Sequence, residues 1–253
     1  MADKGFVSAV IVAAGSSRRM GGINKLLLEI KGKTVLCRSV EAFENTADIN
    51  EIIVAAREED IDEYNALLAQ YKKVKCVVPG GETRQKSVAS AIAACSEQSV
   101  MLAIHDGARP LVSQDVISRT VDAAFECGGA ACGVRAKDTI KVTDSDGMIT
   151  DTPDRATLWA VHTPQCFDKK LYISCVESLG EKAKDMTDDC RLVEICGGKV
   201  RMVEGSYSNI KITTVEDVPM AESLLGDEQI VKNRSRLRCA SPCRRQKAYP
   251  RRC

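Results

Sequence analysis

Short apolar runs alternate with longer amphipathic stretches from the start of the chain to about residue 225. The runs are rich in Val, Ile and Ala, as in strands that are buried on both faces of a sheet. Strands are predicted at Val7–Ala13, Glu51–Ala56, Val74–Val78, Val100–His105, Ala130–Val134 and Val200–Val203. The amphipathic stretches predict helices at Val35–Glu44, Glu58–Tyr71, Thr83–Cys95, Ser113–Glu126, Asp168–Leu179, Asp188–Cys196 and Val215–Leu225. This alternation predicts an α/β fold with a doubly wound, mostly parallel sheet, which binds ligands at the carboxyl ends of its strands.

One segment interrupts the alternation of strand and helix. Residues 138–143 and 148–153 flank the sequence Asp-Ser-Asp-Gly at 144–147, which predicts a β-hairpin. A lone two-stranded ribbon is only marginally stable in water, so it needs another surface to pack against. We therefore expect the arm at about residues 136–158 to pack against a second copy of the chain.

The net charge of +1 is the sum of two unlike parts. Residues 227–253 contain nine Lys or Arg and two acids, a net of +7, which leaves −6 for residues 1–226. The basic tail has no apolar periodicity, so it is predicted to be disordered and residues 1–226 to form a single domain. The tail is interpreted as an appendage outside the fold, and binding to nucleic acid or anionic lipid is the less favoured alternative.

Membrane-spanning proteins are excluded, because no apolar run approaches the roughly 20 residues that cross a bilayer. The N-terminus also lacks the features of a secretory signal, which predicts a cytoplasmic protein. The 12 cysteines are scattered, mostly in apolar surroundings, and are interpreted as reduced. With two histidines and no Cys-x-x-Cys pair, a structural zinc site is not expected.

The first predicted strand leads into a loop at 13–25 with three glycines, two serines and three cations. Its backbone N–H groups and side chains are suited to surround phosphates, although it matches neither the P-loop nor the dinucleotide fingerprint. A merely solvated loop is the alternative. A second Gly-rich segment, Val78–Ser87, starts a helix whose free N–H groups suit an anion or the acceptors of a base. A simple helix-initiating turn is the alternative there.

The segment Ile104–Pro110 has a sharper chemical signature. Asp106 ends an apolar strand, where a carboxylate is placed to hold Mg²⁺ together with substrate phosphates. Arg109 stands close enough to contact an anion, and a turn cap is the alternative role for Asp106. His105 is interpreted as a packed strand-end histidine rather than a base.

Cations occur in four separate loops, together with this one metal-binding carboxylate. Taken singly, the later candidates have structural explanations, with Arg155 in a salt bridge and Thr187 as a helix N-cap. Neither a Ser/His/Asp nor a Cys/His set accompanies them. The inventory favours phosphate chemistry, in which positioning and charge stabilisation do most of the catalysis, over acyl transfer.

Seven segments in this order resemble the 2-C-methyl-D-erythritol 4-phosphate cytidylyltransferases of the nonmevalonate isoprenoid pathway. They are AAGSSRRM with Lys25, GGETRQKSV, HDGARP, RAKDTIK, the Asp-Arg pair before LWAVHTPQ, TDD, and NIKIT followed by EDVPMAE. The resemblance covers Phe6 to about Leu225. It implies a Rossmann-like nucleotidyltransferase that uses CTP and Mg²⁺ and passes CMP to a sugar-alcohol phosphate.

The resemblance also implies roles for individual residues. Arg19 and Lys25 would stabilise the transition state, and Asp106 would bind Mg²⁺. The residues matching the CTP site are Ala14, Gly15, Ser16, Gly81, Glu82 and Ser87, with Arg84 beside them. Those matching the acceptor site are Thr139, Arg155 and Lys211, with Arg109 as a further anion contact. Thr139 and Arg155 would reach the neighbouring subunit's site, which implies a homodimer.

Two alternatives stay open at this point. A ribitol 5-phosphate cytidylyltransferase would share the loops and the metal site, because its acceptor also carries a phosphate and hydroxyls. An inactive relic whose basic tail binds nucleic acid belongs to another functional class. The intact set Arg19, Lys25, Asp106 and Lys211 argues against the second alternative.

Overall fold

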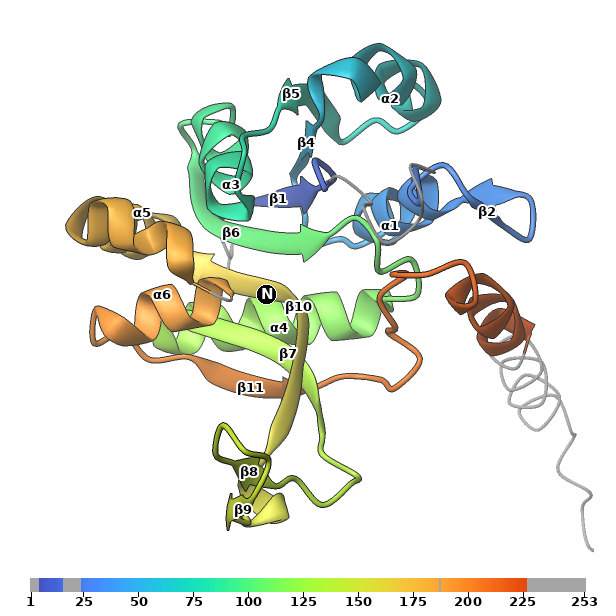
Figure 1. Ribbon diagram of the computed structural model, residues 1–253. Helices are drawn as coiled ribbons and strands as arrows, with labels where there is room; N and C mark the ends of the chain where they lie inside the picture. The colour runs from blue at the N-terminus through green and yellow to red at the C-terminus, as the bar shows by residue number, and fades with distance from the viewer. Residues whose placement is uncertain (1–4, 16–23, 187, 227–253) are drawn as a thin grey trace, which may run out of the picture.

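A seven-stranded sheet with helices on both faces forms the body of the computed structural model, which describes residues 5–15, 24–186 and 188–226 (Figure 1). The strand order is β11 (Arg201–Glu204), β7 (Gly129–Arg135), β10 (Trp159–Asp168), β6 (Ser99–Asp106), β1 (Phe6–Val12), β4 (Glu51–Ala56) and β5 (Val74–Pro79). Strands β1, β4, β5 and β6 are mutually parallel, and β11 is parallel to β7. Strand β10 alone runs opposite to its neighbours β6 and β7. This confirms the predicted mostly parallel α/β sheet.

Both faces of the sheet are buried, so successive side chains of a strand enter different layers. In β1, Ala9 and Ile11 pack into one core, whereas Val10 packs into the other. The first core takes side chains from α1 (Val35–Glu44), α2 (Ile61–Leu68), α4 (Gln114–Cys127) and the helix at 217–226. The second takes them from α3 (Arg84–Ala93), α5 (Lys169–Leu179) and α6 (Asp189–Ile195).

The predicted strands and helices are all present, and most of their ends shift by one or two residues. Among the helices, the largest change concerns the one predicted at Glu58–Tyr71, which starts as a 3₁₀ turn, η2 (Glu58–Asp60), and continues as α2 only to Leu68. Between β1 and α1 lies a short two-stranded ribbon of β2 (Glu29–Ile30) and β3 (Lys33–Thr34). A second 3₁₀ segment, η4 (Gly180–Asp185), follows α5.

Strand β10 was not predicted, although it occupies a central place in the sheet. The segment carries Thr163, Pro164 and Gln165 where a buried strand would carry apolar residues. Thr163 and Gln165 are nevertheless buried, at 4% and 2% exposed, because other parts of the chain satisfy their hydrogen bonds. The pairing of β10 with β7 is irregular between Val161 and Gln165. Apolar and polar residues therefore do not alternate regularly along this segment, and the sequence shows no strand pattern there.

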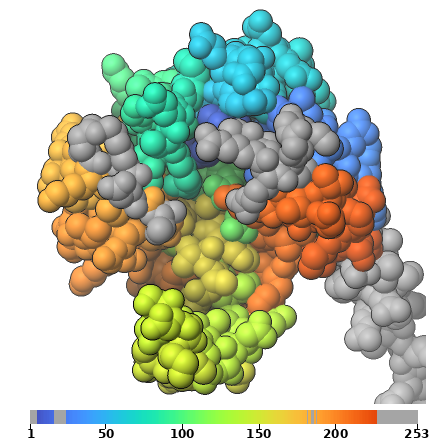
Figure 2. All heavy atoms as spheres, in the orientation of Figure 1, coloured from blue at the N-terminus to red at the C-terminus, as the bar shows by residue number. Residues whose placement is uncertain are grey.

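The arm lies between β7 and β10 and stands off from the body (Figures 1 and 2). Its strands, β8 (Val142–Thr143) and β9 (Ile149–Asp151), are shorter than the predicted ones and pair antiparallel. Asp144 Oδ1 accepts hydrogen bonds from the N–H groups of Asp146 and Met148, and Gly147 adopts a left-handed φ of 81°. The arm ends in a 3₁₀ turn, η3 (Arg155–Thr157).

Within the described ranges, no helix is long and apolar enough to cross a membrane. The nine cysteines in these ranges are all free thiols. The basic tail at 227–253 lies outside the described residues, so its predicted disorder stays a prediction.

Candidate active site

The loops that follow β1, β5 and β6 meet at one edge of the sheet, around a cavity of about 430 Å³. Their strands are parallel, so their carboxyl ends lie at the same edge. The cavity brings together nine of the residues that the sequence singled out: Ala14, Gly15, Lys25, Gly81, Glu82, Arg84, Ser87, Asp106 and Lys211. Three distant stretches of the chain and the loop after β11 therefore contribute to one site.

Among the described residues, three other candidates do not line this cavity: Thr139, Arg155 and Arg109, which lines a neighbouring hollow. Ser16 and Arg19 lie outside the described residues. Thr139 and Arg155 lie exposed on the arm, where the Arg155 guanidinium donates to the carbonyl oxygen of Lys137 at 3.0 Å. A single chain thus does not bring the arm residues into the site.

The loop between β5 and α3 folds tightly over the start of the helix. Thr83 caps α3 by accepting from the N–H of Lys86 at 3.1 Å, and the N–H of Gly81 donates to Ser87 Oγ at 3.1 Å. A Cβ on Gly81 would lie 2.3 Å from that of Lys86, so the close turn requires glycine. The loop therefore presents its backbone to the cavity with little side-chain bulk.

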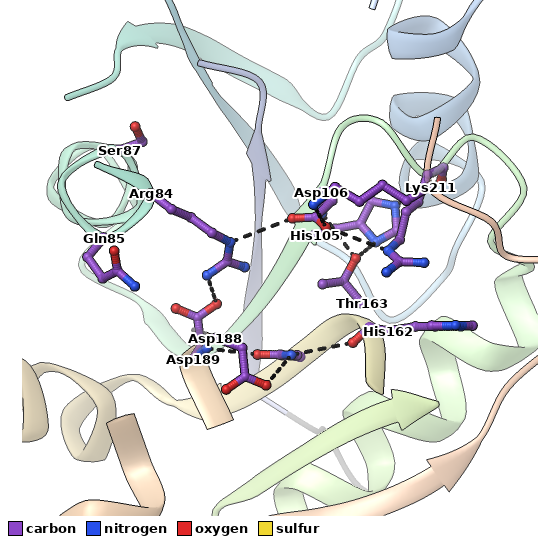
Figure 3. A network of polar contacts seen from close by, with 12 residues as sticks. Arg84, Gln85, Ser87, His105, Asp106, His162, Thr163, Asp188, Asp189 and Lys211 are labelled. Carbon is purple, nitrogen blue, oxygen red and sulfur yellow. Dashed lines mark hydrogen bonds and ion pairs between the residues drawn. The ribbon is translucent and has the colours of Figure 1, made fainter. Parts of the chain in front are cut away.

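Asp106 lies at the end of β6 among three cations (Figure 3). Its carboxylate is 2.8 Å from Lys211 Nζ and 3.6 Å from the Nε atoms of both Arg84 and Arg109. Burial by itself would raise the pKa of Asp106, but the charges of Lys211 and Arg84 lower it well below its usual value. The carboxylate is therefore ionised at neutral pH, and the cluster around it is net positive.

Lys211 reaches Asp106 because two loops are joined by hydrogen bonds. The Arg109 guanidinium donates to the carbonyl oxygen of Asn209 at 2.8 Å, and the N–H of Ile212 donates to that of Ala108 at 2.8 Å. Asn209 is buried and also donates to the Thr163 carbonyl oxygen at 3.0 Å. These contacts hold Lys211, about a hundred residues further along the chain, against the end of β6.

A second, smaller hollow of about 180 Å³ lies beside the first. It shares Arg84, Asp106 and Lys211 with the larger cavity and adds Arg109 and His162. Burial, with a smaller effect from Arg109, lowers the pKa of His162 to about 4, so this imidazole is neutral at neutral pH. The two hollows meet at the cation cluster.

His105 is packed inside the fold and has a supporting role. Its ring nitrogens hydrogen-bond Thr163 Oγ1 at 3.0 Å and the Arg109 carbonyl oxygen at 3.1 Å. Burial lowers the pKa of His105 to about 4. Thr163 also accepts from the Asp106 N–H at 3.1 Å, so β10 braces the end of β6.

The start of α6 differs from its predicted form. Its N-cap is Asp188, which accepts from the N–H of Arg191 at 3.0 Å, rather than Thr187. Asp189 instead turns to the site and binds Arg84 at 2.5 Å. Sequence reasoning treated both acids as helix-start residues and missed this contact. The only available signal was their place in the TDD segment.

The residues present fit one magnesium ion held jointly with a substrate. Asp106 is a single ionised carboxylate at the cavity edge, and within the described ranges no group of three or more His, Cys, Asp or Glu side chains could hold a metal by itself. Mg²⁺ is commonly bound by one or two carboxylates, with substrate phosphates supplying further oxygens. Asp106 therefore meets the minimum that such a site needs.

Comparison with known proteins places the chain among relatives of similar length and fold. The sequence model of the 2-C-methyl-D-erythritol 4-phosphate cytidylyltransferase family matches residues 7–227. The chain is 48% identical over 223 residues to the protein of that name from Caldanaerobacter subterraneus, covering 87% of this chain and 98% of the relative. A Clostridium botulinum protein of the same name is 42% identical, with 86% and 96% covered.

Solved structures agree with the sequence comparison. The crystal structure of 4-diphosphocytidyl-2C-methyl-D-erythritol synthase from Anaerococcus prevotii superposes with a TM-score of 0.81 at 34% identity, covering 88% of this chain and 97% of that one. The family match spans the sheet, both hollows and the arm. This chain belongs to the 2-C-methyl-D-erythritol 4-phosphate cytidylyltransferase family.

Proposed function

We propose that this protein transfers CMP from CTP to 2-C-methyl-D-erythritol 4-phosphate, releasing pyrophosphate and forming 4-diphosphocytidyl-2-C-methyl-D-erythritol, a step of isoprenoid precursor synthesis. The observation that carries the proposal is the pair of hollows that share Arg84, Asp106 and Lys211. A donor nucleotide in the larger hollow and an acceptor phosphate in the smaller one would meet at these three side chains. The family and the names of its relatives support the same reaction.

CTP occupies the larger cavity in this proposal. Ala14, Gly15 and Ser16 contact the triphosphate, and Gly81, Glu82 and Ser87 read the cytosine, with Arg84 beside them. The backbone N–H groups of the Gly-rich turn and the start of α3 suit the acceptor atoms of a base. The small side chains of both loops leave room for the nucleotide's backbone contacts.

The chemical step is a substitution at the α-phosphorus of CTP. An oxygen of the acceptor phosphate attacks this phosphorus, the bond to the bridging oxygen of the β-phosphate breaks, and pyrophosphate leaves with that electron pair. The acceptor phosphate is already ionised near neutral pH, so orientation between cations suffices without a general base. Arg19 and Lys25 stabilise the charge that grows on the α-phosphate, and Lys211 and Arg109 hold the acceptor.

Mg²⁺ is the proposed cofactor, with Asp106 as its protein ligand. When bound, it neutralises phosphate charge and fixes the triphosphate geometry. The chain's own part is to keep Asp106 ionised through Lys211 and Arg84. Their ion pairs also fix the carboxylate at the junction of the two hollows.

A homodimer that exchanges its arms would complete the site. Four apolar side chains on the arm are 44–67% exposed: Ile140, Val142, Met148 and Ile149. An exposed apolar face of this kind is typical of a protein interface. Thr139 and Arg155 lie on the same arm and line neither hollow of their own chain. We place them in the partner's acceptor site.

Methylerythritol phosphate is favoured over ribitol 5-phosphate because the matching family and the relatives described above carry the first name. The basic tail, to which the nucleic-acid alternative was assigned, lies outside the described residues. We assign the protein to the cytoplasm, in keeping with the free thiols of the described residues.

The reaction is tested by magnesium-dependent pyrophosphate release from CTP with each acceptor in turn. Turnover is expected with methylerythritol 4-phosphate and not with ribitol 5-phosphate. Lys25→Ala should lower kcat about 100-fold or more, because one preorganised donor contributes about 3 kcal/mol to the transition state. An unchanged melting temperature verifies that the variant folds. Turnover with ribitol 5-phosphate alone would keep the mechanism and overturn the acceptor.

Gly80 offers a test of the nucleotide site. A Cβ added there would lie 2.5 Å from Ala14 Cβ and 2.8 Å from Ser87 Oγ, so Gly80→Ala must displace two proposed CTP contacts. Overpacking costs about 1–3 kcal/mol, so we expect the KM for CTP to rise roughly tenfold, with a smaller change for the acceptor. Gly205→Ala is the control, since its Cβ would also make a tight contact, 3.3 Å from the Gly133 carbonyl oxygen, but at a glycine that lines neither hollow. Equal changes in both KM values would contradict the assignment.

Arm exchange is tested by a heterodimer of one Lys25→Ala chain and one Arg155→Ala chain, isolated through two different affinity tags. With exchanged arms, one site contains both intact residues and the other contains neither. The heterodimer should therefore recover about half of the wild-type activity, as two-fold symmetry requires. If Arg155 served its own chain, both sites would carry one defect and activity would stay low. That result would refute the exchange.

A further inference from the structure

Arg84 lies between two carboxylates, and its guanidinium is closer to one of them than to the other (Figure 3). Its Nη1 is 2.5 Å from Asp189 Oδ2, whereas its Nε is 3.6 Å from Asp106 Oδ1. The first contact is a hydrogen-bonded ion pair and the second is only a charge contact. Arg84 is therefore held by Asp189 while it faces Asp106 and both hollows.

Asp189 is itself held on several sides. Its side chain is fully buried, and its second oxygen, Oδ1, accepts from the Tyr172 hydroxyl at 2.7 Å. Its N–H donates to Gln165 Oε1 at 3.1 Å, and it lies in the first turn of α6, where a negative charge is favourable. Residues from α5, β10 and α6 thus fix the direction of this carboxylate. Such fixation gives Arg84 one preferred position.

We propose that Asp189, supported by Tyr172, is a positioning residue that holds the Arg84 guanidinium at the junction of the two hollows and keeps it from closing onto Asp106. The inference rests on the proposed function and deepens it. The Asp106 oxygen that faces Arg84, Oδ1, then stays accessible, so that it can bind a divalent cation together with the triphosphate. Arg84 in turn keeps donors free for a phosphate.

The physical reason lies in the fork geometry of arginine. Five donors in one plane favour a two-bond contact with a carboxylate, and a partly buried guanidinium that loses its partner moves to the next one. Asp106 is that next partner, already 3.6 Å away. Without the charge of Asp189, Arg84 would close onto Asp106, whose other oxygen already faces Lys211 and Arg109. The carboxylate would then have no open side.

A double-mutant cycle separates positioning from a merely structural role. The proteins are wild type, Asp189→Asn, Arg84→Gln and the double variant. The readouts are kcat, and the affinity for CTP measured by calorimetry with and without Mg²⁺. In the wild-type background, Asp189→Asn should reduce both kcat and the Mg²⁺-dependent gain in CTP affinity by roughly tenfold, within the range of coupled contacts. In the Arg84→Gln background, Asp189→Asn should change kcat and the Mg²⁺-dependent gain in CTP affinity by less than about twofold each.

Equal effects of Asp189→Asn in both backgrounds would overturn the proposal, because Asp189 would then act without Arg84. Asp60→Asn is the matched control. Asp60 is also a buried carboxylate paired with an arginine, Arg57 at 2.7 Å, and neither residue lines a hollow. It should lower the melting temperature without changing the gain from Mg²⁺. A loss of that gain in Asp60→Asn would likewise overturn the proposal.

Tyr172→Phe provides a second route if Asp189→Asn does not fold. It removes one hydrogen bond to Asp189 and leaves all charges in place. We expect Tyr172→Phe to reduce the Mg²⁺-dependent gain in CTP affinity about two- to threefold. In the Arg84→Gln background, the same substitution should cause no such reduction. If Tyr172→Phe still reduced this gain in the Arg84→Gln background, Tyr172 and Asp189 would not act through Arg84, and the proposal would be refuted. The calorimetry uses CTP and Mg²⁺ alone and does not depend on the acceptor. An absence of turnover with methylerythritol 4-phosphate would therefore overturn the acceptor assignment without affecting this test.

Discussion

The ionised carboxylate of Asp106 is the constraint around which the site is organised. It is 8% exposed at the end of a central strand, where an unpaired charge would be expensive. Burial by itself would raise its pKa, but three cations, from the start of α3 and from the loops after β6 and β11, surround it and lower the pKa. Even with Asp189, which is paired with Arg84, the three cations outnumber the two carboxylates, so the junction attracts further anions. An excess of this sign is suited to a site where two phosphate groups must be brought together against their own repulsion.

Local pattern was enough to predict the features that depend on neighbours in sequence. Alternating buried strands and amphipathic helices indicated the sheet, and its strand ends pointed to Asp106, Lys25 and the Gly81 turn. The resemblance to a family then assigned roles to these residues. The local pattern and the family resemblance point to the same residues, because a parallel sheet brings the carboxyl ends of its strands together at one edge.

Features that depend on distant partners were not readable from the sequence. Strand β10 escaped notice because Thr163 and Gln165 are polar, and their burial makes sense only once His105 and the start of α6 are in place. Asp189 looked like a residue of the helix start, although its partners are Tyr172 and Arg84. The arm's strands were predicted too long, and among the described residues its apolar side chains pack against no surface and stay exposed.

Strand β10 also limits where the chain can change length. It leaves the arm at Trp159 and passes Thr163 beside Asp106 before Gln165 meets α6. Trp159, Ala160 and Val161 pair with β7 in unbroken register. Since side chains alternate between the two faces of a strand, adding or removing one residue in this stretch would exchange the faces of the residues on one side of the change. The arm's turn at 144–147 carries no such restriction, because its residues are exposed. Variation in length among relatives should therefore gather at the tip of the arm and spare its root.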